Sequence, residues 1–153
     1  MDRKSAGRVI LLVEDEPDDE ELARLALEGS RMVEQLVVAR DGVEALDYLF
    51  ATGAHAGRDP RRTPDLILLD LKLPKVDGLE VLRRLRADDR TKLLPVVILT
   101  SSDEEQDLLK GYTLGANSYV RKPVDFTQFT EAVCQLGLYW LVLNQPPPRR
   151  SRA

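Results

Sequence analysis

Acidic, hydroxyl and basic side chains follow directly after four short apolar runs of this 153-residue chain. In chain order they are Glu14 and Asp15 after residues 9–13, Asp70 after 66–69, Thr100 after 96–99 and Lys122 just beyond 118–120. If these runs are parallel strands of one sheet, their carboxyl ends share an edge, which is where ligands bind in open α/β sheets. The five side chains are therefore expected to form one site.

The chemistry of such a site would centre on its three carboxylates. Carboxylates a few ångströms apart repel each other, so either a pKa rises or a cation enters. Mg²⁺ suits a site whose ligands are all oxygens, because it commonly binds one or two carboxylates together with water and phosphate oxygens. The hydroxyl of Thr100 and the ammonium of Lys122 suit anionic oxygens. Together these groups favour phosphoryl transfer to a carboxylate, with Asp70 as the acceptor.

Taken one at a time, these signals have simpler explanations. An acid, a threonine or a lysine at the end of a strand can cap a helix, form a turn or remain solvated. The four acids of residues 18–21, which follow Pro17, are expected to stabilise the positive end of a helix dipole rather than to bind metal. The joint order of the polar groups, each at the end of an apolar run, is what favours a site.

The elements that would position these groups alternate along the chain. Short apolar strands are expected at 9–13, 35–39, 66–69, 96–99 and 118–120. Amphipathic helices are expected near 17–27, 43–50, 79–87, 103–114 and 126–143. Such alternation predicts an α/β fold, in which right-handed crossovers connect the strands of a parallel sheet.

Capping-box patterns mark several of the helix starts. In this pattern the first side chain accepts a hydrogen bond from a backbone N–H and the fourth residue reaches back. It begins at Asp41, Asp77, Ser102 and Asp125. Residues 52–64 are expected to form an exposed loop, longer than the roughly 2–6 residues usual between a helix and a strand.

Composition narrows the possible partners. The chain is 43% hydrophobic and 31% charged, as in ordinary globular proteins, and its formal net charge of −4 argues against nucleic-acid binding. No apolar stretch reaches the roughly 18 residues that a membrane span needs, and a signal peptide is not evident. We expect one cytoplasmic domain at 9–143, with a flexible start at 1–8 and a disordered basic tail at 144–153.

These motifs resemble the receiver domain of two-component response regulators. The resemblance rests on Val13-Glu14-Asp15, on LDLKLP at 69–74, and on Asp77-Gly78, Leu99-Thr100-Ser101 and Lys122-Pro123. It covers nearly the whole chain. It implies a flavodoxin-like fold, in which a five-stranded parallel sheet of order 2-1-3-4-5 carries helices on both faces.

The resemblance also implies a role for each residue of the site. Asp70 would accept a phosphoryl group from a phosphohistidine of a histidine kinase, so the domain would be a signalling switch rather than an enzyme. Mg²⁺ (or Mn²⁺) would be held by Glu14, Asp15, Asp70 and the backbone carbonyl of Lys72, with Glu14, where many members have aspartate, acting mainly through water. Thr100 and Lys122 would contact the phosphoryl oxygens, Tyr119 would change rotamer as Thr100 moves, and the Lys122–Pro123 bond would be cis.

The residues two positions beyond Asp70 and Thr100 fall where the family tunes the lifetime of the phosphoryl group. Here they are Lys72 and Ser102. Neither is an acid or an amide that would position a hydrolytic water. Slow self-dephosphorylation is therefore expected.

The last expected helix is the best candidate for an output surface. Its apolar stripe consists of Phe126, Phe129, Val133, Leu136, Trp140 and Leu143. Residues 136–143 are apolar all round, however, and an exposed apolar patch usually marks a partner surface. The long 52–64 loop and this ending resemble stand-alone regulators paired with bacterial phytochrome kinases. That resemblance implies a homodimer through the fourth helix, fifth strand and fifth helix, with Tyr139, Trp140 and Leu143 at its surface.

Three alternative functions would each predict a different residue pattern. A phosphatase with an aspartate nucleophile would carry a second aspartate at position 72, which is a lysine. A nucleotide or flavin module would need a glycine-rich turn after the first strand, where Glu14-Asp15-Glu16 would repel phosphate unless a metal intervenes. An adaptor that works without phosphorylation would not need the complete acceptor set.

Overall fold

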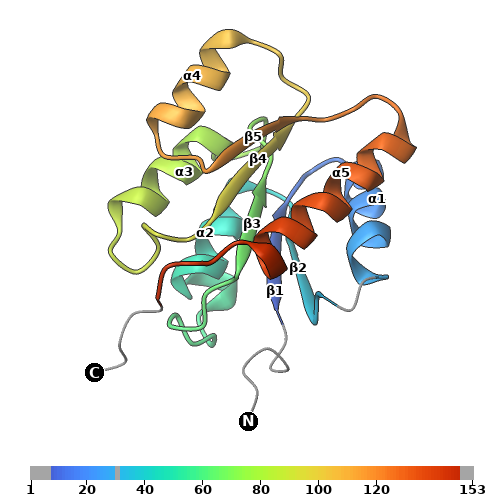
Figure 1. The fold of residues 1–153 in the computed structure, drawn as a ribbon. Helices are drawn as coiled ribbons and strands as arrows, with labels where there is room; N and C mark the ends of the chain where they lie inside the picture. The colour runs from blue at the N-terminus through green and yellow to red at the C-terminus, as the bar shows by residue number, and fades with distance from the viewer. Residues whose placement is uncertain (1–7, 30–31, 149–153) are drawn as a thin grey trace.

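One parallel β-sheet organises the structure, a computed structural model that describes residues 8–29 and 32–148 (Figure 1). Its strands are β1 (Val9–Val13), β2 (Gln35–Ala39), β3 (Leu66–Leu69), β4 (Val96–Thr100) and β5 (Ser118–Arg121). They lie in the order β2-β1-β3-β4-β5, which confirms the predicted topology. Of the termini expected to be flexible, residues 1–7 and 149–153 lie outside the described residues.

Helices cover both faces of this sheet. They are α1 (Pro17–Glu28), α2 (Gly42–Phe50), α3 (Gly78–Ala87), α4 (Glu105–Thr113) and α5 (Phe126–Leu138), with a 3-10 turn η2 (Gly53–His55) and a π-helical turn η3 (Tyr139–Leu143). Buried residues of α1 and α5 pack on one face and those of α2 and α3 on the other. Figure 1 shows α1 beside α5 and places α4 above α3.

The central strand β3 shows why the apolar runs form a sheet buried on both sides. Leu66 and Leu68 pack toward α1 and α5, while Ile67 and Leu69 pack toward α2 and α3, and all four are at most 1% exposed. Fully burying such a side chain contributes about 1.5–3 kcal/mol. In the register, Leu69 lies level with Val13 of β1 and Ile98 of β4, so the chain leaves these three strands at one edge.

Aspartates begin three of the helices as the capping pattern predicts. The side chains of Asp41, Asp77 and Asp125 accept hydrogen bonds from backbone N–H groups of the first turns of α2, α3 and α5. The prediction for Ser102 is wrong, because α4 begins at Glu105, after Glu104, without a side-chain cap. The Ser102 hydroxyl instead donates to Asp107 Oδ2 over 2.6 Å, which ties the β4–α4 loop to the first turn of α4.

The last helix differs from the single amphipathic helix expected over 126–143. It is α-helical to Leu138 and then continues as the π-turn η3, where the Asn144 N–H donates to the Tyr139 carbonyl. A turn closed by an i to i+5 bond contains about one residue more than an α-helical turn. It therefore changes which of the last side chains face the sheet. Leu141, outside the predicted stripe, is consequently 2% exposed, whereas Leu143 of the stripe is 62% exposed. Phe126 of the stripe, at the first position of α5, is 65% exposed.

Candidate functional site

The carboxyl ends of β1, β3 and β5 bring acidic and basic side chains together, as the sequence predicts. Lys122 follows β5, and its Nζ lies 2.7 Å from Glu14 Oε1 and 3.1 Å from Asp70 Oδ2. It also lies 2.7 Å from Oδ2 of Asp19, which belongs to the first turn of α1. An ammonium has three donors, and here each faces a carboxylate.

Glu14, Asp70 and Lys122 are buried, and the pKa values of Glu14 and Lys122 are shifted. Burial raises the pKa of Glu14 to about 7, an effect that the nearby Lys122 ammonium only partly opposes and that the Asp70 charge reinforces. Burial alone would lower the pKa of Lys122, but its bonds to Asp19 and Glu14 outweigh that effect and raise it above the ordinary value. The two shifts therefore have different causes: desolvation raises the pKa of Glu14, whereas neighbouring carboxylates raise that of Lys122.

The same acids fit a divalent cation. Ligand oxygens of Glu14, Asp15 and Asp70 all lie within 4.8 Å of one another. Asp15 Oδ1 is buried and has no hydrogen-bond partner among the described residues. A buried acceptor without a donor is costly and rare, so this oxygen is suited to a ligand outside the protein chain. An all-oxygen donor set of carboxylates matches Mg²⁺ or Mn²⁺.

The loop after β3 fixes the orientation of Asp70. Its Oδ1 accepts a hydrogen bond from the Leu71 N–H at 2.7 Å, while Oδ2 faces Lys122. The loop closes where the Gly78 N–H donates to the Leu71 carbonyl. A Cβ at Gly78 would collide with the backbone carbonyl of Asp70, so only glycine lets α3 begin this close to the acid. Lys72 projects from this loop into solvent.

Thr100 and Tyr119 lie at the β4–β5 side of the site. Thr100 is fully buried at the last position of β4, and its carbonyl accepts from the Lys122 N–H at 2.7 Å. The Tyr119 hydroxyl donates to the Ser102 carbonyl at 3.4 Å. Its ring lies under α4, where a Cβ at Gly111 would press against it. The Ser102 N–H lies 3.4 Å from Thr100 Oγ1, so both predicted switch residues contact the loop that enters α4.

Two expectations from the sequence need correction. Asp19 was assigned to the helix dipole alone, yet it contacts Lys122, 103 positions along the chain. Its place in the first turn of a helix that starts at the site edge is the signal that could have suggested this contact. The predicted cis Lys122–Pro123 bond is wrong, because the described residues contain no cis peptide bond. Trans is the favoured state of such bonds, and Lys122 reaches all three carboxylates with it.

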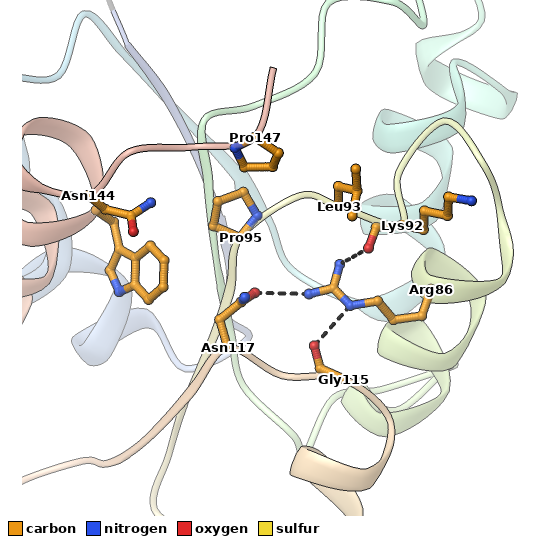
Figure 2. Close-up of a pocket in the computed structure, with 9 residues that line it drawn as sticks. Arg86, Lys92, Leu93, Pro95, Gly115, Asn117, Asn144 and Pro147 are labelled. Atoms are coloured by element: carbon orange, nitrogen blue, oxygen red, sulfur yellow. Dashed lines mark hydrogen bonds between the residues drawn. The ribbon is translucent and has the colours of Figure 1, made fainter. Parts of the chain in front are cut away.

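A pocket of about 270 Å³ lies at the opposite end of the strands, near the residues that lead into β4 and β5 (Figure 2). Arg86 lines this pocket and donates to the carbonyls of Gly115 and Lys92 and to the Asn117 side chain. Burial lowers the pKa of this guanidinium. Because its donors are used to join α3 to the loops before β4 and β5, we interpret Arg86 as a structural residue.

Comparison with known proteins identifies the class to which this fold and site belong. The family model of the response regulator receiver domain matches residues 10–134. The chain belongs to this family, whose members are signalling domains of two-component systems. Within the described parts of the chain, no helix is both long and apolar enough to cross a membrane.

Among curated proteins, two relatives match nearly end to end. The probable methanogenesis regulatory protein FilR2 of Methanothrix harundinacea is 40% identical over 139 residues, which cover 91% of this chain and 87% of the relative. Response regulator Rcp1 of Synechocystis is 38% identical over 140 residues, covering 92% of this chain and 93% of Rcp1.

Solved structures that resemble this chain include response regulators associated with phytochromes. The phosphorylated cyanobacterial phytochrome response regulator RcpA has a TM-score of 0.87 at 39% identity, with 93% of this chain and 99% of that one covered. The Mn²⁺-bound form of Rcp1 gives 0.85 at 36% identity, with 92% and 99% covered. The bacteriophytochrome response regulator AtBRR gives 0.70 at 55% identity, with 90% and 98% covered.

Proposed function

We propose that this receiver domain accepts a phosphoryl group on Asp70 in a Mg²⁺-dependent reaction and signals through the resulting change of its own surface. The observation that carries this proposal is the convergence of Glu14, Asp15, Asp70 and Lys122, together with a buried Asp15 oxygen that has no protein donor. The phosphorylated relative RcpA and the Mn²⁺-bound relative Rcp1 support both parts of it.

In the proposed reaction a carboxylate oxygen of Asp70 attacks the phosphorus of a phosphohistidine. A P–O bond forms as the P–N bond breaks, and the imidazole leaves with a proton from solvent. The Leu71 N–H holds the Asp70 carboxylate in one orientation for this attack. Lys122 lies close enough to transfer one of its donors from Asp70 to an oxygen of the phosphoryl group.

Glu14, Asp15, Asp70 and the backbone carbonyl of Lys72 would hold the cation. When bound, Mg²⁺ supplies positive charge that offsets the repulsion between these carboxylates and the incoming phosphate. Asp15 gains most from such a ligand, because its buried Oδ1 has no other partner among the described residues.

The conformational change that follows phosphorylation would be transmitted from Asp70 to α4. Phosphorylation adds about −1.5 to −2 charge beside Thr100 and Lys122. A movement of Thr100 toward that charge would pull on the loop that carries Ser102. Because Tyr119 and Asp107 both bind Ser102, the loop movement would reach β5 and α4. Phosphorylation would thereby favour one of two arrangements that exist beforehand.

A histidine kinase of the phytochrome type is the partner that the comparisons favour, since RcpA is a phytochrome response regulator and AtBRR a bacteriophytochrome response regulator. We propose that this reaction takes place in the cytoplasm and that the domain has neither a nucleic-acid nor a membrane partner, which the formal net charge of −4 supports for nucleic acid. The output would pass through a homodimer along α4, β5 and α5, where Tyr139 and Leu143 are exposed and Trp140 is half-buried.

Labelling with acetyl phosphate and Mg²⁺ tests the acceptor directly. The chain should gain one phosphoryl group by intact mass, and the gain should disappear with EDTA or in Asp70→Asn. Asp103→Asn, at an exposed acid on the same edge of the sheet, should be labelled like the parent. Persistent labelling of Asp70→Asn would assign the phosphoryl group elsewhere. Absence of any labelling would favour the adaptor alternative.

A further inference from the structure

Asp19 lies outside the acceptor set, yet it makes one of the shortest contacts to Lys122. Its Oδ2 is 2.7 Å from the ammonium, as close as Glu14 and closer than Asp70 at 3.1 Å. The contact joins the first turn of α1 to the end of β5, across the mouth of the site. Asp19 and Lys122 are 103 positions apart in the sequence, so only the tertiary fold brings them together.

The three partners of Lys122 differ in how readily they can release it. The side chains of Glu14 and Asp70 are 2% and 7% exposed, whereas that of Asp19 is 29% exposed. A buried carboxylate loses its ammonium partner only at a large desolvation cost, but water can replace the ammonium at a partly exposed one. Glu14 and Asp70 are therefore sufficient to keep Lys122 in place without Asp19.

All three donors of Lys122 are used before any phosphoryl group arrives. A phosphoryl group on Asp70 therefore obtains a donor only if the ammonium turns its Asp70-facing donor toward the phosphoryl oxygens, away from the position that its other two contacts fix. The Asp19 carboxylate opposes that turn from the solvent side, and it also adds negative charge where an anionic phosphodonor would enter.

We propose that Asp19 is a positioning residue that restrains Lys122 and thereby slows phosphorylation of Asp70. This inference rests on the proposed function. Loss of the Asp19 charge should free Lys122 for the phosphoryl oxygens while the two buried carboxylates keep its side chain in the site.

The test compares Asp19→Asn with Asp18→Asn in the full chain. Asp18 neighbours Asp19 in the first turn of α1 and is exposed, so its substitution removes the same charge beside the same helix end. With acetyl phosphate and Mg²⁺, Asp19→Asn should be phosphorylated about two- to fivefold faster than the parent, the range expected for one partly exposed ion pair. The phosphorylation rate of Asp18→Asn should stay close to that of the parent, and both variants should remain folded with a small loss of stability, because each removes one acid from the positive end of the helix dipole.

A double-substitution cycle separates restraint of Lys122 from simple repulsion of the donor. In a Lys122→Gln background, Asp19→Asn should no longer accelerate phosphorylation, because its effect is transmitted through the ammonium. An acceleration that persists in that background, or an equal one in Asp18→Asn, would overturn the proposal in favour of general electrostatics. An unchanged rate in Asp19→Asn would also overturn it. Failure of the parent to be labelled at all would instead refute the proposed function.

Discussion

The lifetime of a phosphoryl group on Asp70 depends on whether a neighbouring side chain can hold a water molecule in line with it. The Ser102 hydroxyl is not free for this task, because it donates to Asp107 at 2.6 Å. Lys72 extends into solvent and offers only donors, so it cannot accept a proton from an attacking water. These two side chains support the expectation of slow self-dephosphorylation.

Lys72→Asn should shorten the lifetime several-fold, because an amide can orient a water molecule beside the acceptor. The measurement is loss of label after rapid removal of the phosphodonor, which in the parent should take minutes. Lys75→Asn is the matched control, since Lys75 is an exposed lysine of the same loop with φ of 69°, a conformation that asparagine tolerates. Loss of most label from the parent within seconds would contradict the expected stability.

Most residues of the site could be predicted from the sequence, but Asp19 was not. Glu14, Asp15, Asp70, Thr100 and Lys122 each end or follow an apolar strand, so topology alone predicts that they share an edge. Asp19 lies within a helix, and its reach to Lys122 depends on where α1 sits against the end of β5. The position of Asp19 in the first helical turn after the site was the available signal, but the helix dipole already explained an acid there.

At the scale of elements, the close approach of α3 to the acceptor loop depends on Gly78. This residue begins α3, and any Cβ there would meet the Asp70 carbonyl and the Leu71 backbone. Both opposing groups are backbone atoms next to the acceptor, so they cannot move aside without moving Asp70. Glycine is therefore required by the geometry rather than by the conformation of the helix start.

Gly78→Ala should destabilise the fold by about 1–3 kcal/mol, the usual cost of forcing a methyl group into a filled space. It should also slow phosphorylation by displacing Asp70. Chemical unfolding and the acetyl phosphate rate measure the two effects. Gly57→Ala is the control, because nothing lies within 4 Å of a Cβ at Gly57, and its stability and rate should stay near those of the parent. Equal behaviour of the two variants would disprove the steric argument.

The strands and most helix starts were predictable because each depends on local signals, an apolar run or a capping aspartate. The predictions failed where tertiary contacts compete with those signals. Ser102 has a capping sequence, but its hydroxyl bonds Asp107 and α4 begins three residues later. The π-turn η3 is stabilised by burial of Leu141, which 3.6-residue periodicity assigns to the wrong face.

At the scale of the whole molecule, α4 and η3 each leave large apolar side chains exposed. They are Leu108, Leu109 and Tyr112 on α4, and Tyr139, Val142 and Leu143 on η3. Exposed apolar side chains favour association, and α4 packs beside the edge strand β5, so a two-fold arrangement along this edge would bury part of them. This arrangement would let the Thr100–Tyr119–α4 connection reach a second copy of the chain.

Leu143→Glu should therefore shift the chain from dimer toward monomer at micromolar concentration, because it places a charge within the apolar contact. Leu25→Glu is the matched control: Leu25 on α1 is 63% exposed against 62% for Leu143, but it lies outside the α4–β5–α5 face. Sedimentation of both variants and the parent, before and after phosphorylation, gives the masses. A monomeric parent in both states would refute the dimer, and equal dissociation of the Leu25 variant would assign the contact to a different face.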